Sequence, residues 1–240
     1  MSRYPRTAVA AVAATACLAA ITSCGYGPSG PPRAPRTEPL TEADLRSVLP
    51  AGDPFQDFIA RPYPEATETP APISAPESTR LSPESPKACG ALVDFEMDRV
   101  RHRPAAHVWA RMTRRGDEGK DIDFTKLNSV RLSSYSVKEA STVMDSLSQA
   151  LLTCSYFIAY TMNYGDQDAA IVIGERKAPD AGDDAVAFTW TVSGIAMNQT
   201  VPITVVRTGG VLTTYSGAVP ADIPQKQHEK IRALITGTSG

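Results

Sequence analysis

The alternation of apolar and polar residues is clearest between residues 137 and 154, where apolar side chains recur at the spacing of a helix. The apolar positions are Val137, Ala140, Val143, Met144, Leu147, Ala150, Leu151 and Cys154. This pattern predicts an amphipathic helix that packs one face on the core and carries Cys154 on that face.

Three further segments have helical signals. Residues 222–237 predict a closing amphipathic helix, with Asp222 as its cap, Gly237 as its stop and His228 on its polar face. Its inward side chains are expected to be Ile223, Ile231, Leu234 and Ile235. A Thr-x-x-Asp cap predicts a short helix over 41–49, and residues 88–101 predict a helix that begins at a cysteine.

Strand patterns fill much of the remaining chain. Residues 105–115 and 129–136 precede the long helix, and residues 169–177, 185–194, 200–210 and 211–217 follow it. The last two segments predict a hairpin that closes at Thr208-Gly209-Gly210. Because strands follow one another without intervening helices, we expect an α+β fold, an antiparallel sheet with helices packed on one face.

The first 24 residues have the pattern of an export signal. Arg3 and Arg6 precede an apolar run over 8–21, which is too short to cross a membrane as a helix. Ile21-Thr22-Ser23-Cys24 then resembles the bacterial lipobox, which implies cleavage before Cys24 and a diacylglyceryl thioether on its sulfur. The alternative is an ordinary signal peptide that leaves Cys24 as a thiol.

Composition divides the rest of the chain. We expect a lipoprotein signal peptide over 1–23, a lipidated Pro/Gly-rich tether over 24–39 and a Pro-rich arm with a short helix over 40–87. The α+β sensor or ligand-binding domain is expected over 88–240.

The chain has four cysteines, and the export signal accounts for Cys17 and Cys24. Cys89 and Cys154 then remain outside the reducing cytosol, which favours a disulfide between them. A bridge that closes so long a loop contributes about 4 kcal/mol in the chain-entropy model. The alternative is a pair of free thiols in a redox or metal site, although neither cysteine has CxxC spacing.

Motifs for catalysis are missing from the sequence. His102, His107 and His228 lack the spacing of zinc ligands, and no Gly-x-Ser-x-Gly turn is present. Asp166 and Asp168, and again Asp180, Asp183 and Asp184, are interpreted as acidic turns and not as calcium ligands. We therefore predict no catalytic residue, no metal, no cofactor and no enzymatic activity.

Charge and aromatic residues leave two interpretations open. The formal net charge is −2, yet six arginines lie between residues 99 and 115: Arg99, Arg101, Arg103, Arg111, Arg114 and Arg115. They form either a solvated face or a patch for anionic lipids or wall polymers, and nucleic acid is not expected. Six aromatic residues either line a groove or belong to the core: Trp109, Trp190, Tyr156, Phe157, Tyr160 and Tyr164.

Several short motifs resemble one family, the actinobacterial lipoproteins with an extracellular sensor domain of the PknH type. They are "LTEADLRSVLPAGDPF" at 40–55, Cys89 followed by Leu92, "SSYSVKEASTVMDSLSQALLTC" at 133–154, "GDDAVAFT" at 182–189 and "VVRTGGVL" at 205–212. The resemblance implies an extracytoplasmic α+β module with a groove for an unidentified small ligand or envelope protein, and no established catalytic residues.

The sequence therefore predicts a lipoprotein on the extracytoplasmic face of the cell membrane, anchored through Cys24, that acts as a ligand-binding or sensing module. A lipid or glycolipid carrier, or an accessory to an envelope enzyme, is the alternative.

Overall fold

The computed structural model describes residues 36–51, 55, 58–62, 79–97, 102–114, 128–161, 167–193 and 199–238. The predicted signal peptide, Cys24 and most of the tether lie outside the described residues, as do Tyr164, Asp166, Arg99, Arg101 and Arg115. No helix in the described ranges has the length and hydropathy to span a bilayer.

The described strands form one antiparallel sheet with the order β1-β3-β4-β9-β8-β7-β6-β5-β2. Their bounds are β1 Phe58–Pro62, β2 Thr79–Leu81, β3 Ala106–Arg114, β4 Asn128–Ser134, β5 Tyr156–Thr161, β6 Gln167–Glu175, β7 Asp184–Ser193, β8 Gln199–Thr208 and β9 Val211–Ser216. Strands β8 and β9 form the predicted hairpin, in which Thr208 pairs with Val211 across the Gly209-Gly210 turn.

The helices are α1 (Glu42–Ser47), α2 (Gly90–Met97), α3 (Val137–Thr153) and α4 (Asp222–Thr236), with a 3-10 turn at Lys87–Cys89 before α2. Capping boxes start α1 and α3, through Thr41 with Asp44 and Ser136 with Glu139. Helix α4 begins after Ala221, so Asp222 is its first residue and not its cap. Gly237 ends it as predicted, in the left-handed region with φ 69°.

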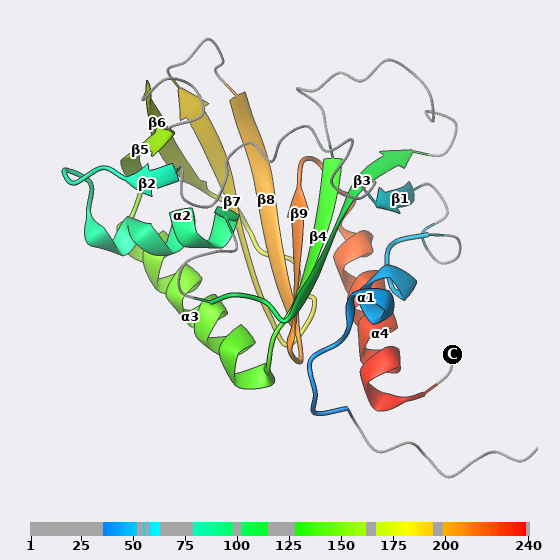
Figure 1. Ribbon diagram of the computed structural model, residues 1–240. Helices are drawn as coiled ribbons and strands as arrows, with labels where there is room; N and C mark the ends of the chain where they lie inside the picture. The colour runs from blue at the N-terminus through cyan, green and yellow to red at the C-terminus, as the bar shows by residue number, and fades with distance from the viewer. Residues whose placement is uncertain are drawn as a thin grey trace, which may run out of the picture. The chain divides into compact units, whose positions relative to one another are not determined.

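The helices form two layers on opposite faces of the sheet (Figure 1). The α2–α3 layer packs on Phe157, Ile171, Phe188 and Val205, among others. The α1–α4 layer packs on the other face, against side chains that include Val108, Val130, Val206 and Tyr215.

This arrangement confirms the α+β class and the antiparallel sheet and corrects the expectation that the helices pack on one face. The physical reason lies in the central strands, where consecutive residues point to opposite faces. Val205 and Leu212 are buried beneath one layer, whereas Val206 and Val211 are buried beneath the other. Strands that are apolar on both faces require cover on both.

The predicted disulfide is confirmed. Cys89 and Cys154 are bonded, with their Cα atoms 5.5 Å apart, and both are buried in the α2–α3 core. The bond joins the start of α2 to the end of α3, which excludes the alternative of two free thiols.

The segment over 40–87 differs most from expectation. It supplies α1 and also β1 and β2, which are the two edge strands of the sheet. Leu45, Phe55 and Phe58 are buried, so the described residues from Arg36 onward form one compact unit, without a boundary at residue 88. Proline is tolerated at a sheet edge because a strand there needs ladder bonds on one side only, and Pro62 is the last residue of β1.

Candidate functional site

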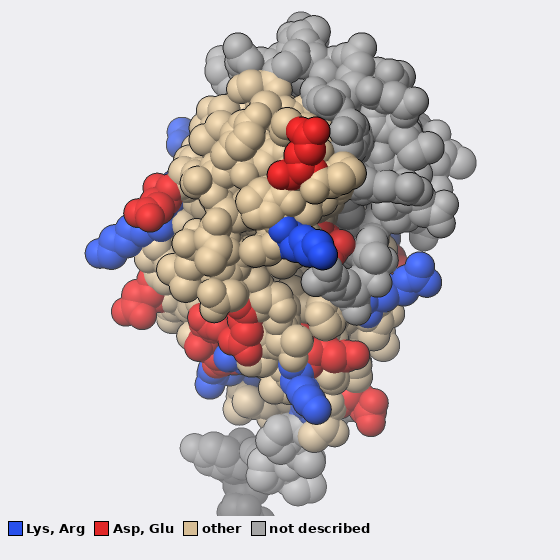
Figure 2. Space-filling view, turned by 90° about the vertical axis from the view of Figure 1, so that its left-hand side faces the viewer, with Lys and Arg blue, Asp and Glu red and all other residues tan. Residues whose placement is uncertain are grey.

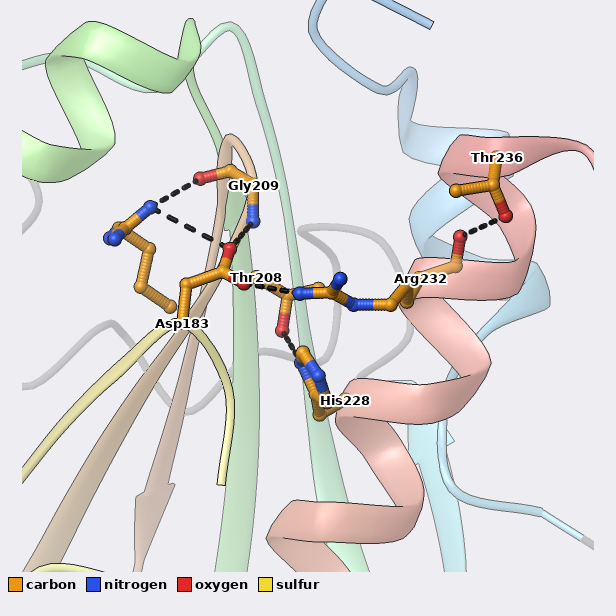
Figure 3. Close-up of polar contacts among 7 residues, drawn as sticks. Asp183, Thr208, Gly209, His228, Arg232 and Thr236 are labelled. Atoms are coloured by element: carbon orange, nitrogen blue, oxygen red, sulfur yellow. Dashed lines mark hydrogen bonds and ion pairs between the residues drawn. The ribbon is translucent and has the colours of Figure 1, made fainter. Parts of the chain in front are cut away.

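A polar cluster joins the β8–β9 turn to α4 around the carboxylate of Asp183 (Figure 3). The Gly209 backbone N–H donates to Asp183 Oδ2 at 2.7 Å, and the Arg232 guanidinium pairs with Oδ1. Arg207 Nη1 lies 3.6 Å from Oδ2. Gly182 places this carboxylate, because its φ is +79° and a Cβ there would lie 2.4 Å from Val206 Cγ1.

His228 lies in the same cluster and not on the polar face of α4, where the sequence placed it. It exposes 9% of its surface, and its Nδ1 is 2.8 Å from Thr208 Oγ1. Burial lowers the pKa of His228, and the neighbouring Arg232 lowers it further, while Asp183 and Glu229 act in the opposite direction. The imidazole is therefore held neutral at neutral pH.

Helix α4 also holds the end of α1. Gln227 Nε2 donates to the Val48 carbonyl at 2.6 Å, and Lys230 Nζ donates to the Leu49 carbonyl at 3.0 Å. These contacts satisfy carbonyl groups that a helix end leaves without intrahelical partners. Gln227, His228, Lys230 and Arg232 thus dock this helix. Within the described residues, no group of three or more His, Cys, Asp or Glu side chains is placed to hold a metal ion.

A groove of about 750 Å³ lies along the edge of β3, beside the start of α1. Its walls are residues 39–42 and Arg46 on one side and residues 105–109 on the other. Trp109, with 37% of its surface exposed, and the exposed His107 belong to the wall that β3 forms. The groove combines an aromatic surface, an imidazole and the apolar side chains of Leu40 and Val108, which is the composition of a ligand site.

Two arginines adjoin the groove where β1 ends. Arg61 of β1 and Arg111 of β3 are direct partners in the antiparallel register, and Pro62 faces Ala110 one residue nearer the groove. We call Arg61 and Arg111 the arginine pair. Like charges directly opposite each other destabilise a sheet, and among the described residues neither arginine has an acidic partner.

The structure divides the basic cluster predicted between residues 99 and 115. Arg111 and Arg114 are three residues apart on β3, so their side chains point to opposite faces of the sheet. Arg114 lies over the Phe58 ring at 5.7 Å, on the face toward the α1–α4 layer. Arg103 is exposed before β3 begins. On the α2–α3 side of the molecule, acidic and basic side chains are interspersed (Figure 2).

The aromatic residues also divide between surface and core. Trp109 lies at the groove, whereas Phe157 packs edge-on against Trp190 in the α2–α3 core, with ring centroids 5.5 Å apart. Tyr156 is half exposed on β5, at the far end of the sheet from β3.

His102 lies in a different place from the other two histidines. It lines a small pocket of about 80 Å³ with Asp94 and Phe95 of α2 and Val143 of α3. Arg131 lies over the ring of Phe95, at 5.3 Å, and donates to its carbonyl at 2.9 Å. These contacts attach the end of α2 to β4, and the pocket is too small for more than a few solvent-sized groups.

Comparison with known proteins gives likeness in structure but none in sequence. No family model matches the chain, and no curated protein matches it significantly. Among solved structures, the extracellular domain of PknH from Mycobacterium tuberculosis is similar with a TM-score of 0.49 at 11% identity, covering 84% of this chain and 100% of that chain. A likeness at this level assigns no residue of this chain a role.

Arg61 is the residue of the candidate site that sequence reasoning missed. It lies in the proline-rich arm, where the sequence predicted a short helix but no strand, and its partner lies 50 positions further along the chain. The β-favouring residues Phe58 and Ile59 are a weak strand signal, but nothing in the sequence indicates that this segment pairs with β3.

Proposed function

We propose that this protein is an extracytoplasmic binding or sensing module, anchored to the cell membrane by a lipid on Cys24, with its ligand site in the groove beside β3. The groove is the observation that carries the proposal, because it places Trp109 and His107 at an open cavity of about 750 Å³, large enough for a small molecule. Binding without catalysis is proposed, since no pattern of nucleophile and base was found in the sequence.

Two features support the location. The lipobox-like Ile21-Thr22-Ser23-Cys24 follows a short apolar run, and the buried Cys89–Cys154 disulfide is of a kind that persists in oxidising compartments. Both favour a location of the domain outside the cytosol, and a diacylglyceryl group on Cys24 would keep the domain at the membrane.

The anchor is tested by labelling cells with a clickable palmitate analogue. We expect the wild-type chain to incorporate the label and to fractionate with membranes. Cys24→Ala should lose the label and leave the membrane fraction, whereas Cys17→Ala should behave as the wild type. Label on the Cys24→Ala chain, or membrane retention of that chain, would contradict the anchor.

The groove is tested by native mass spectrometry of the full chain purified from the cells that produce it. We expect a bound small molecule that is lost in Trp109→Ala and kept in Val172→Ala, a control that changes another exposed strand residue. A ligand that survives Trp109→Ala would place the binding site elsewhere. A bound acyl lipid unaffected by groove changes would favour the alternative of a lipid or glycolipid carrier.

A further inference from the structure

The arginine pair beside the groove places two like charges opposite each other, which the pairing of β1 with β3 does not require. Arg61 and Arg111 are cross-strand partners, so their Cβ atoms lie about 4.5–5.5 Å apart on the same face. Arg61 is exposed and Arg111 is partly exposed. Two guanidinium groups at this spacing, with no acidic partner among the described residues, repel each other, and an anion placed between them would relieve that repulsion.

None of the described helices has its main contacts with the face of β3 that carries the pair. On that face of the sheet, α3 packs against β7, β8 and β9. Helix α1 covers β3 on the opposite face. Trp109 lies two residues from Arg111 on the same strand, so both side chains point to the same side of the sheet. Trp109 is also a diagonal neighbour of Arg61, within reach of a long side chain.

From this geometry we infer that Arg61 and Arg111 bind the phosphate group of a small phosphorylated ligand, whose remaining part lies against Trp109 in the groove. The inference rests on the proposed function, because it names the chemical class of ligand for the same site.

Charge and shape favour a phosphate monoester over other anions. A phosphate monoester carries a charge between about −1.5 and −2 at neutral pH and has three terminal oxygens. It can therefore neutralise both arginines and accept hydrogen bonds from both guanidinium forks, whereas one fork already occupies both oxygens of a carboxylate.

A membrane surface is the less suitable partner. Basic patches that recognise anionic bilayers usually contain about four to eight Lys or Arg side chains. Here the arginine pair stands beside a tryptophan and a histidine, while Arg114 points to the opposite face of β3. Arg131 lies opposite Trp109 on the same face, but the Phe95 carbonyl and ring hold its guanidinium. The arginine pair next to the cavity therefore matches one discrete anionic group.

The test titrates the purified full chain with inorganic phosphate and with glucose 1-phosphate, following tryptophan fluorescence and thermal stability. The variants are Arg61→Gln and Arg111→Gln. Arg114→Gln is the matched control, because it removes the same charge from the same strand on the opposite face. We expect each change in the pair to weaken phosphate binding by about tenfold or more, with Arg114→Gln close to the wild type.

Two further results would support the inference. Glucose 1-phosphate should bind more tightly than inorganic phosphate, and Trp109→Ala should abolish this difference while inorganic phosphate still binds. In phosphate-free buffer, Arg61→Gln should melt at a higher temperature than the wild type, because the like-charge pair is gone. If Arg61 served only to stabilise the fold, Arg61→Gln would instead melt at a lower temperature than the wild type.

The inference would be overturned by a wild-type chain that does not respond to either phosphate, by an equal loss in Arg114→Gln, or by binding confined to phosphatidylcholine vesicles that contain phosphatidylglycerol. A ligand without phosphate that copurifies with the chain and is retained by Arg61→Gln would support the proposed function and overturn this inference alone.

Discussion

The two helix layers cover opposite faces of one sheet, yet they are held to it by different kinds of interaction. In the α2–α3 layer, the disulfide between Cys89 and Cys154 closes an apolar core. The α1–α4 layer also has an apolar core, but α4 is held in addition by polar contacts along its length, through His228, Gln227 and Lys230 and through Arg232 to Asp183.

This difference separates two sources of stability. A disulfide acts chiefly by restricting the unfolded chain, and it does not respond to pH in the physiological range. Buried polar groups stabilise only while each keeps its partner and its protonation state. The α1–α4 layer is also the one that carries residues 39–42 at the groove. The groove thus lies beside the layer whose attachment depends on solution conditions.

Removing the disulfide should have the largest effect on stability. The double change Cys89→Ala and Cys154→Ala opens a loop with a sequence separation of 65 residues. We expect the free energy of unfolding to fall by about 4 kcal/mol, measured by urea denaturation. A reductant should lower the stability of the wild type similarly and leave the variant unchanged. A loss below about 1 kcal/mol would show that the apolar core alone holds the α2–α3 layer.

The polar attachment of α4 is tested at Asp183. Asp183→Asn keeps the shape of the side chain and removes the charge that pairs with Arg232 and faces Arg207. We expect a loss of about 1 kcal/mol in the free energy of unfolding, because solvent screens the exposed ion pair with Arg232. Asp180→Asn changes an exposed aspartate of the same turn and serves as the control. Equal effects of the two variants would contradict the special role of Asp183.

Much of the fold could be predicted because the relevant signals are local. Helix α3 was recognised from its apolar spacing, and the β8–β9 hairpin from its glycines. The presence of helices on both faces had a signal too, since Val205-Val206 and Val211-Leu212 are consecutive apolar residues in strands. Such pairs mark strands that are buried on both sides.

The missing elements depend on distant partners. Strands β1 and β2 are short and proline-flanked, and each has its ladder bonds from a single neighbour, β3 or β5. Nothing within residues 58–62 indicates that Arg61 faces Arg111. The position of His228 was missed because helical spacing alone did not show that Thr208 would offer a hydroxyl to a ring on the border of the apolar face.

The smallest effect we predict is a pH dependence that belongs to the α1–α4 layer alone. The folded chain lowers the pKa of His228 below its ordinary value of 6.5, so below that pH the unfolded chain binds more protons than the folded one. Stability should therefore be unaffected by this group above pH 6.5 and should fall as the pH drops toward the lowered pKa.

The groups that face the ring are Thr208, Arg232, Asp183 and Glu229, and Arg232 opposes its protonation. Carboxyl groups with lowered pKa values, such as Asp44 and Glu139, contribute at lower pH, because their ordinary values are 3.8 and 4.5. Thermal melting between these values and pH 6.5 should show the slope in the wild type and in His107→Gln, a control at an exposed position, and should lose it in His228→Gln. An unchanged slope in His228→Gln would assign the pH response to other groups and would remove the difference between the two layers in this respect.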